Sequence, residues 1–272
     1  MAPSARPGRS RSLARGKMLG KYRIGAQLGE GGFAVVYKAR DTVEGIDVAL
    51  KVPRAQMLAG GSLDDLLKEV RITGRLEHPG ILPIKNATFV EQQLVIAYPL
   101  GEKSLADRLR HRIASRTALD YGQQLLEAVA YAHSRRVIHC DINPNNVILF
   151  PDGTARLTDF GIARIALQTR MIHGSGTGTV GYIAPEQALG QPSFRSDVFS
   201  LGLIFFRLFS GVLPCWPYVW PMAGSAKLRR KLRPEMIEFI RRAIEVNERR
   251  RFRNAIPMLS AFEKVRKRAL RT

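Results

Sequence analysis

The first third of the chain combines short β-type runs with one helical stretch. Valine, isoleucine and aromatic residues, which favour strands, gather in runs bounded by glycine or polar residues. We expect five strands in one antiparallel sheet: two within residues 22–40, around a glycine-rich turn, and the others at 48–51, 84–89 and 94–98. Between them, apolar residues at positions 63, 66, 67 and 70 predict one face of a helix over 62–75.

From residue 104 onward the apolar spacing becomes helical. Positions 121, 125, 128, 129 and 132 share one face of a helix predicted over 119–134. The apolar run 198–213 indicates a buried helix, because polar residues interrupt it below membrane-spanning length. Two last helices are expected at 234–243 and 255–269. The pattern therefore predicts an α+β chain, with a small antiparallel β part and a larger, mainly helical part.

A polar loop, residues 139–146, interrupts the helical part. The apolar residues 137–138 precede it and a second apolar run follows it, so we expect a strand on each side. Asp141 and Asn146 lie five residues apart in this loop, and another carboxylate, Asp159, follows in the sequence LTDFGIAR. A short Asp/Asn loop alone usually forms a turn. The downstream carboxylate makes this loop a candidate site.

The loop and the downstream carboxylate resemble two motifs of the eukaryotic-type (Hanks-type) serine/threonine protein kinases, H-R-D-x-x-x-x-N and D-F-G. The resemblance covers about residues 22–266. It implies a bilobal kinase-like fold that binds ATP and Mg²⁺ and phosphorylates serine or threonine of protein substrates. It also implies that Asp141 accepts the hydroxyl proton and that Asn146 and Asp159 hold the Mg²⁺ ion.

The same resemblance places the nucleotide on the first lobe. Glycines of the hairpin loop let backbone N–H groups approach phosphate oxygens. Lys51, in a run that matches the V-A-I-K strand, is expected to bind phosphates, and Glu69 on the predicted helix is expected to pair with it. The residues expected to contact the nucleotide are Leu28, Gly29, Gly31, Val36, Ala49, Lys51, Ile96, Tyr98 and Leu149.

Two departures from the family lie in the polar loop. Cys140 replaces the arginine of H-R-D, so the loop is of the non-RD type. Asn143 replaces the lysine that neutralises charge on the transferred phosphoryl group, and we count Asn143 as a catalytic position. Loss of one such electrostatic donor typically costs about 10²–10³ in rate, so low activity is expected unless an arginine elsewhere in the chain compensates. A pseudokinase that acts as a nucleotide-binding or scaffolding module is the alternative.

A third motif follows the D-F-G-like sequence. Residues 178–186 resemble the G-T-x-x-Y-x-A-P-E end of the activation segment, in which the Thr179 hydroxyl contacts the catalytic loop. By the same resemblance Glu186 pairs with Arg251, and Asp197 binds backbone of the catalytic loop. The motif suits a peptide substrate, although a small-molecule phosphotransferase of the same general fold stays a second alternative.

Charge is distributed unevenly along the chain. Of the net charge of +20, +7 falls on residues 1–29 and +11 on residues 227–272, so the middle is nearly neutral. Such basic ends attract acidic proteins, nucleic acid or anionic membrane non-specifically. The two cysteines suggest no disulfide or metal framework, and a cytoplasmic location is expected.

The motifs and the charge pattern together suggest a division of the chain. We expect a basic, disordered tail over 1–20, a kinase N-lobe over 21–98 and a kinase C-lobe over 99–270. No apolar run is long enough for a transmembrane segment.

Overall fold

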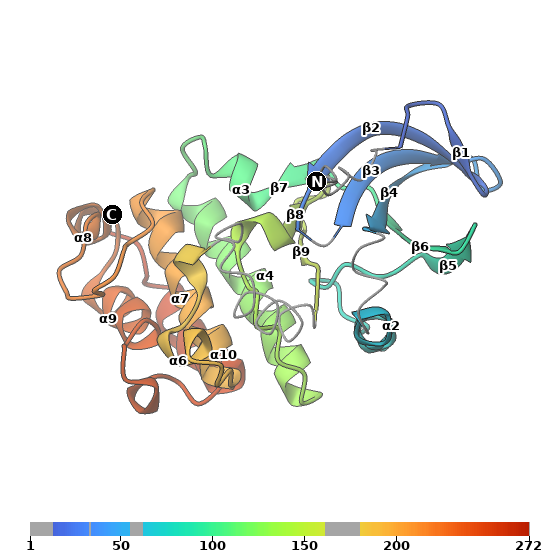
Figure 1. Ribbon diagram of the computed structural model, residues 1–272. Helices are drawn as coiled ribbons and strands as arrows, with labels where there is room; N and C mark the ends of the chain where they lie inside the picture. Colours follow the sequence, from blue (N-terminus) through green and yellow to red (C-terminus); the bar gives the residue numbers. More distant parts are fainter. Residues whose placement is uncertain (1–12, 33, 55–61, 161–179, 272) are drawn as a thin grey trace, which may run out of the picture. The chain divides into compact units, whose positions relative to one another are not determined.

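A computed structural model describes residues 13–32, 34–54, 62–160 and 180–271 (Figure 1). The chain divides into two compact units. The first comprises the described residues up to Leu67 together with Ile84–Leu100, and the second comprises Lys68–Pro83 together with the described residues from Gly101 onward. The predicted domain limits stay predictions.

The first unit is built on a six-stranded antiparallel sheet (Figure 1). The strands pair in the order β1-β2-β3-β4-β6-β5. Their bounds are β1 Met18–Leu19, β2 Tyr22–Glu30, β3 Ala34–Asp41, β4 Ile46–Pro53, β5 Asn86–Val90 and β6 Gln93–Pro99. The five predicted strands are present, and β1 is additional.

Strand β1 lies within residues 1–20, for which we expected a disordered tail, so that prediction was wrong for Met18 and Leu19. Met18 and Leu19 pair with Arg23 and Tyr22 of β2, and Leu19 is buried in the core of the unit. Two apolar residues are too few to show a period, so the sequence pattern could not predict this strand. Residues 1–12 lie outside the described residues.

One face of the sheet forms the core of the first unit. Side chains alternate between the two faces of a strand, so every second residue of β3 and β4 points into this core. Its fully buried strand residues are Leu19, Tyr22, Ile24, Val35, Tyr37, Ala39, Val48, Leu50, Val52, Val95 and Ala97. Burial of each large side chain contributes about 1.5–3 kcal/mol.

The helix predicted over residues 62–75 is α2, Ser62–Thr73. In the second unit a three-stranded sheet pairs in the order β7-β8-β9. Its strands are β7 Lys103–Ser104, β8 Val147–Leu149 and β9 Ala155–Leu157. The backbone of Leu157 also bonds Gly80 and Leu82, which fixes the segment after α2 against β9.

The polar loop has a strand on one side only. Strand β8 follows the loop as predicted, but residues 137–138 form none. The reason is the end of the preceding helix. Arg136 has a φ of 60°, and the Val137 N–H donates back to the Ala132 carbonyl at 2.9 Å. The N–H group of Val137 is therefore used to cap the helix and is not available for pairing with another strand.

The second unit is mainly helical. Its longer helices are α4 Ser115–Ser134, α7 Phe194–Ser210, α9 Pro234–Ala243 and α10 Ala255–Arg266. Its shorter ones are α3 Leu105–Arg108, α6 Pro185–Ala188 and α8 Ser225–Lys231, with 3₁₀ turns at η1 Pro144–Asn146, η2 Val180–Tyr182 and η3 Glu248–Arg250. In the described part of the chain, no helix combines the length and apolar content needed to span a bilayer.

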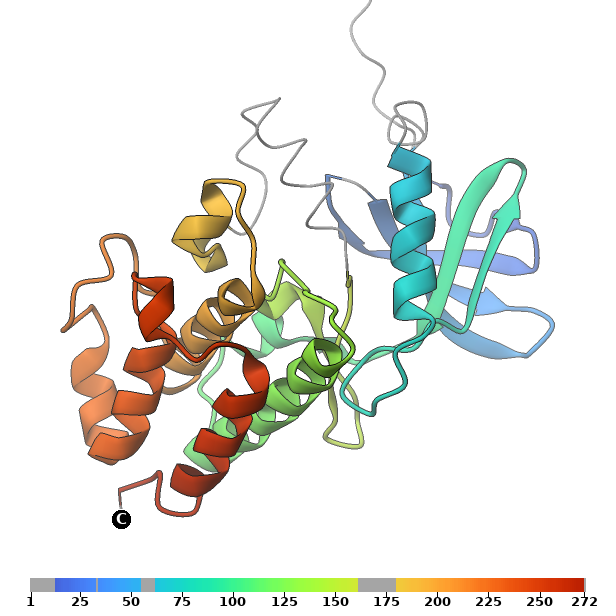
Figure 2. The ribbon, with the colours of Figure 1, turned by 90° about the horizontal axis from the view of Figure 1, so that it is seen from below.

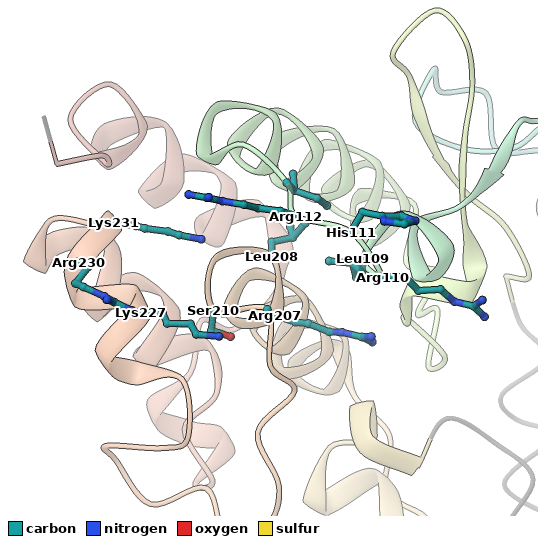
Figure 3. A pocket seen from close by; sticks show the side chains of 12 residues that line it. Leu109, Arg110, His111, Arg112, Arg207, Leu208, Ser210, Lys227, Arg230 and Lys231 are labelled. Atoms are coloured by element: carbon teal, nitrogen blue, oxygen red, sulfur yellow. The ribbon is translucent and has the colours of Figure 1, made fainter.

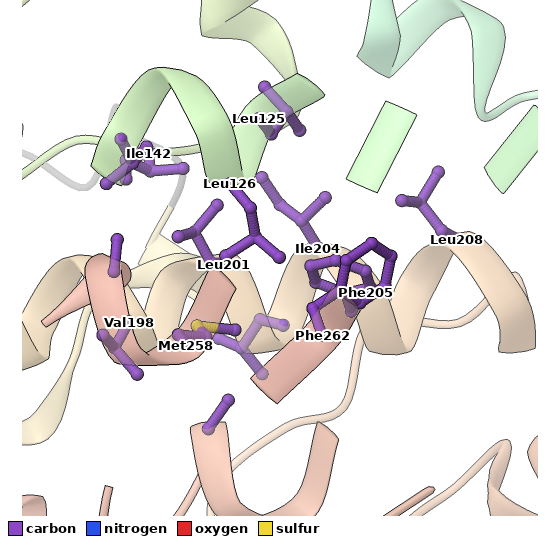
Figure 4. Packing of buried hydrophobic residues seen from close by; sticks show 14 of the residues in the cluster. Leu125, Leu126, Ile142, Val198, Leu201, Ile204, Phe205, Leu208, Met258 and Phe262 are labelled. Carbon is purple, nitrogen blue, oxygen red and sulfur yellow. The ribbon is translucent and has the colours of Figure 1, made fainter. Parts of the chain in front are cut away.

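Helices α4, α7 and α10 pack side by side (Figure 2). Leucines of α4, Phe205 of α7 and Phe262 of α10 meet in their shared core (Figure 4). The rings of Phe205 and Phe262 lie 5.3 Å apart between centroids. A Cβ atom at Gly122 of α4 would lie 2.4 Å from the Phe205 ring, so this glycine permits the close approach of α4 and α7.

Helix α7 is shorter than the predicted run 198–213 at its C-terminal end. Gly211 takes the left-handed conformation, with φ 73°, and its N–H bonds the Arg207 carbonyl. A residue in this conformation ends a helix, because it turns the following residues away from the helix axis. At the other end, Ser193 and Ser196 form a capping box.

An ion pair that the resemblance implied connects α6 to the segment before α10. Arg251 donates to both carboxylate oxygens of Glu186, at 2.8 and 3.0 Å, and also to backbone carbonyls, among them Arg195. Its guanidinium lies 4.6 Å from the centre of the Phe199 ring. The Arg251 side chain is fully buried, so its charge depends on these partners.

We expect that Arg251→Leu lowers the free energy of unfolding by about 3–5 kcal/mol, because it leaves the partly buried Glu186 carboxylate without its cation. The double variant Arg251→Leu/Glu186→Gln should recover part of this loss. Urea unfolding of the three proteins measures both effects, and equal losses in the single and double variants would contradict this account.

The same pair predicts a pH dependence. Burial would raise the pKa of Glu186, but hydrogen bonds from Arg251 and Ser196 outweigh burial and hold this pKa below its usual value. A carboxyl with a lowered pKa adds stability above its unfolded pKa, and loses it as the pH falls through the folded pKa. Below about pH 4.5, wild-type stability should fall more steeply than that of Glu186→Gln.

Candidate active site

Buried hydrogen bonds from α7 fix the polar loop in its place. The carboxylate of Asp197, which is 1% exposed, accepts from the backbone N–H groups of His139 at 2.7 Å and Cys140 at 2.8 Å. It also accepts from His133 Nε2 of α4 at 2.9 Å. Since the Ala255 N–H donates to Nδ1 of His133, the proton of that imidazole is on Nε2. The backbone contact implied by the resemblance is therefore present.

Cys140 occupies a left-handed backbone conformation, with φ 62°. This conformation is unfavourable for a residue with a side chain, so other contacts must hold it. The Cys140 N–H donates to Asp197, and its carbonyl accepts from the side-chain amide of Gln187. The backbone of the loop is thus fixed at Cys140 through both its amide and its carbonyl.

His139 connects the loop to the end of β9. Its Nδ1 accepts from the Asp141 N–H at 3.1 Å, so its Nε2 carries the proton and donates to the Thr158 carbonyl at 2.9 Å. Its ring packs against that of Phe160, with centroids 4.6 Å apart, and both side chains are fully buried. His139 therefore positions the residues on either side of Asp159 relative to Asp141.

Two side-chain amides hold the carboxylate of Asp141. Asn143 Nδ2 donates to Asp141 Oδ1 at 3.1 Å, and Asn146 Nδ2 donates to Asp141 Oδ2 at 2.9 Å. Both amides also donate to the Asp141 backbone carbonyl. Asn143 Oδ1 accepts from the Asn145 N–H and so caps η1. These contacts orient the carboxylate and fix the short turn that follows it.

Asp159 directly follows Thr158, whose backbone is hydrogen-bonded to the polar loop. The Thr158 N–H donates to the Asn146 carbonyl at 2.9 Å, so the two predicted metal ligands lie on adjacent backbone segments. Asp159 has a φ of 65°, an uncommon conformation for a residue other than glycine. Such strain is found where a side chain must be directed to a particular place, often at functional sites.

This donor set fits Mg²⁺. Asn146 uses its Nδ2 atom on Asp141, which leaves its carbonyl oxygen Oδ1 as the ligand, and Asp159 offers a carboxylate. Mg²⁺ takes oxygen ligands and keeps several waters, so it is commonly held by one or two protein groups together with phosphates.

The predicted nucleotide residues of the first unit gather on one face of its sheet. In the register, Lys51 of β4 lies between Val36 of β3 and Ile96 of β6, and Ala49 pairs with Tyr98. These positions alternate with the core residues of the same strands, so they lie on the face opposite the core. Lys51 is only 6% exposed.

The glycine turn of the first unit joins β2 to β3. Gly29 pairs with Val36, and the Gly31 N–H donates to the Ala34 carbonyl at 2.9 Å. Among the described residues, no atom lies within 4 Å of a Cβ built on Gly29. Leu28, at the end of the same strand, is half exposed. Open space around this turn is what close approach of a phosphate to backbone N–H groups requires.

The other predicted residues are distributed over the second unit. Glu69 is buried on α2, and Leu149 is buried in β8. Thr179 lies outside the described residues. The structure places four of the predicted site residues on the polar loop and the backbone segment bonded to it: Asp141, Asn143, Asn146 and Asp159. Their roles in catalysis stay predictions.

The sequence analysis missed three residues that position this site. They are His133, His139 and Gln187. Only His139 belongs to a motif that the sequence shows, because it stands at the first position of the H-R-D-like sequence. Each bonds a backbone group or carboxylate that is distant in the chain, which spacing alone does not indicate.

Comparison with known proteins supports this arrangement. The family described as "Protein kinase domain" matches residues 22–260. The chain is 31% identical over 257 residues to CBL-interacting serine/threonine-protein kinase 12 of Arabidopsis thaliana, covering 90% of this chain and 53% of that protein. It is 34% identical over 223 residues to CBL-interacting protein kinase 16 of Oryza sativa subsp. japonica, covering 79% and 49%. The chain thus spans about half the length of these relatives.

A solved structure is similar as well. The kinase domain of Mycobacterium tuberculosis PknI superposes with a TM-score of 0.70 at 26% identity, covering 93% of this chain and 99% of that one. The predicted α+β kinase fold, with an antiparallel sheet in one lobe and helices in the other, is confirmed. The motifs, the geometry of the loop and these matches agree, and the chain belongs to the protein kinase domain family.

Proposed function

We propose that this chain transfers the γ-phosphoryl group of ATP to serine and threonine hydroxyls of protein substrates, with Mg²⁺ bound. The observation that carries the proposal is the pair of amides, Asn143 and Asn146, on the Asp141 carboxylate, one backbone hydrogen bond away from the segment of Asp159. A relative named as a serine/threonine-protein kinase supports the reaction class.

In the proposed reaction, Asp141 accepts the proton of the attacking hydroxyl. The Asn143 and Asn146 amides keep its carboxylate in one orientation, so it need not reorganise when the substrate arrives. Asn146 Oδ1 and the Asp159 carboxylate are the proposed ligands of Mg²⁺. When bound, the ion would neutralise negative charge on the phosphates.

The first unit is proposed to supply the nucleotide contacts. Backbone N–H groups near Gly29 and Gly31 would approach the phosphates, and Lys51 would bind the α- and β-phosphates, with Glu69 orienting it. The low exposure of Lys51 on the non-core face supports this role, because a buried ammonium needs a charged or polar partner. The remaining proposed nucleotide contacts are Leu28, Val36, Ala49, Ile96, Tyr98 and Leu149, and Thr179 is the proposed contact of the activation segment with the loop.

The rate of transfer is proposed to be low. Asn143 stands where the family has lysine, and its side chain is engaged in the loop through both its amide nitrogen and its carbonyl oxygen. It brings no positive charge to the phosphoryl group. The same observation favours the second candidate function, a nucleotide-binding module that transfers no phosphate.

The first test separates the two candidates. Asp141→Asn and Asp159→Asn should each reduce phosphate transfer by at least about 10²-fold, because one removes the proton acceptor and the other a metal ligand. Transfer of labelled phosphate from ATP to the protein itself and to a serine-containing peptide mixture measures the effect. Asp152→Asn, which alters an exposed carboxylate between β8 and β9, is the matched control. Equal labelling of wild type and Asp159→Asn would refute the enzyme proposal.

The second test restores the missing charge. Asn143→Lys should raise the transfer rate about tenfold or more, because a preorganised cation would face the developing charge. It should also lower the melting temperature slightly, since the cap on η1 is lost. Asn145→Lys, two residues along the same turn, adds the same charge at a position for which we propose no catalytic role. A rate unchanged by Asn143→Lys, or raised equally by Asn145→Lys, would count against the assignment.

A further inference from the structure

A second feature of the helical unit is a basic pocket of about 540 Å³ (Figure 3). It is lined by the segment after α3, the C-terminal end of α7 and helix α8, and none of the candidate active-site residues lines it. Of the described residues, six lysines and arginines line it, and no aspartate or glutamate does; the six are Arg110, Arg112, Arg207, Lys227, Arg230 and Lys231.

Three of these cations have polar partners in the fold. Lys231 Nζ donates to the Phe209 carbonyl at 2.7 Å, and Arg207 Nη1 donates to the Tyr182 hydroxyl at 2.9 Å. Arg110 lies 3.5 Å from the Asp107 carboxylate. It is the only lining cation that forms an ion pair among the described residues. The positive charge of the pocket is therefore largely uncompensated.

The cations also act on one another. Burial lowers the pKa of Lys231, and the neighbouring charges of Arg112, Lys227 and Arg230 lower it further. A group of like charges held together by the fold costs stability, which a bound anion would recover. The chemistry of the lining thus indicates an anionic ligand.

The pocket also has an apolar part. Ile113 and Leu208, which are buried, and Leu109, which is half-buried, also line it. Duplex nucleic acid binds mainly through its phosphate backbone and has no apolar group that would fill the apolar part of the pocket. A peptide can place an apolar side chain next to an anionic one. Among anions, phosphate suits a site rich in arginine, because the guanidinium group binds it through two parallel hydrogen bonds.

We propose that this pocket binds a phosphorylated segment of a protein partner, with the phosphate among Arg112, Lys227 and Arg230 and an apolar neighbour against Leu208. In this way the chain would select protein substrates that already carry a phosphate. The selection of substrates depends on the proposed kinase function, whereas the binding itself does not.

The test measures binding without catalysis. The probe is a fluorescent peptide with one phosphoserine between leucines, added without nucleotide to the Asp159→Asn protein, with anisotropy read at about 150 mM salt, where long-range attraction is screened. Lys227→Glu/Arg230→Glu should weaken binding by about tenfold or more, because two charge-assisted contacts become repulsive. Arg229→Glu is the control on the same helix, since Arg229 is exposed but does not line the pocket; it changes the net charge by half as much as the double variant does.

Each outcome supports or overturns the proposal. Loss of binding in the double variant but not in Arg229→Glu, together with weaker binding of the unphosphorylated peptide, supports it. Equal loss in both variants indicates a general effect of net charge and overturns it. So does tighter binding of a short duplex DNA, or of phosphatidylserine vesicles, with the same dependence on Lys227 and Arg230.

A second variant guards against misfolding. Arg112→Glu changes the opposite wall of the pocket, on a segment outside α8, and should weaken binding of the phosphopeptide as well. Melting temperatures of all variants are compared with that of the parent protein. If a pocket variant keeps the melting temperature of the parent protein and binds the phosphopeptide equally well, the changed residue does not contact the phosphate. Failure of phosphate transfer in the wild type leaves these binding results standing, so the two proposals fail separately.

Discussion

The buried carboxylate of Asp197 is the constraint on which the catalytic loop depends. A carboxylate out of water is costly unless hydrogen-bond donors surround it. Here the donors are the backbone N–H groups of His139 and Cys140 and the Nε2–H of His133. Because two of the three come from the loop itself, a change in the loop backbone would leave this carboxylate with His133 as its one remaining donor among these three.

The rest of the site follows from that fixed start. With its backbone held, His139 can bond Asp141 on one side and Thr158 on the other, and its ring packs against Phe160. The loop and the segment around Asp159 are then joined through buried contacts. Glu186 and Arg251 form a second buried polar contact, which connects α6 to the segment before α10. Aromatic side chains of α7 pack against both polar groups. The Phe194 ring lies 4.8 Å from that of His133, and the centre of the Phe199 ring lies 4.6 Å from the Arg251 guanidinium.

Much of this arrangement could be predicted from the sequence. Runs of strand-favouring residues predicted five strands of the first sheet, and the order and spacing of Lys51, Asp141, Asn146 and Asp159 predicted the family. Such features are local or repeat at a fixed period, so single residues carry the signal. Asp197 of α7, which accepts hydrogen bonds from the backbone of the loop, was also found, although only through resemblance to the family.

Other features depend on contacts between distant segments. Strand β1 has too few residues to show a period, and residues 137–138 were assigned a strand because helix termination at Arg136 left no clear signal. The capping role of Asn143 depends on the turn that follows it. The basic pocket unites residues near 112, 207 and 230, which are neighbours only once α7 and α8 have packed together. No pattern along the chain shows such a grouping in advance.

The backbone at Cys140 has a consequence for how this loop can diverge. Its amide and its carbonyl are both bound by groups of α6 and α7, whatever side chain the residue carries. The side chain at this position can therefore be exchanged while both backbone hydrogen bonds, and with them the start of the Asp141 segment, stay as they are.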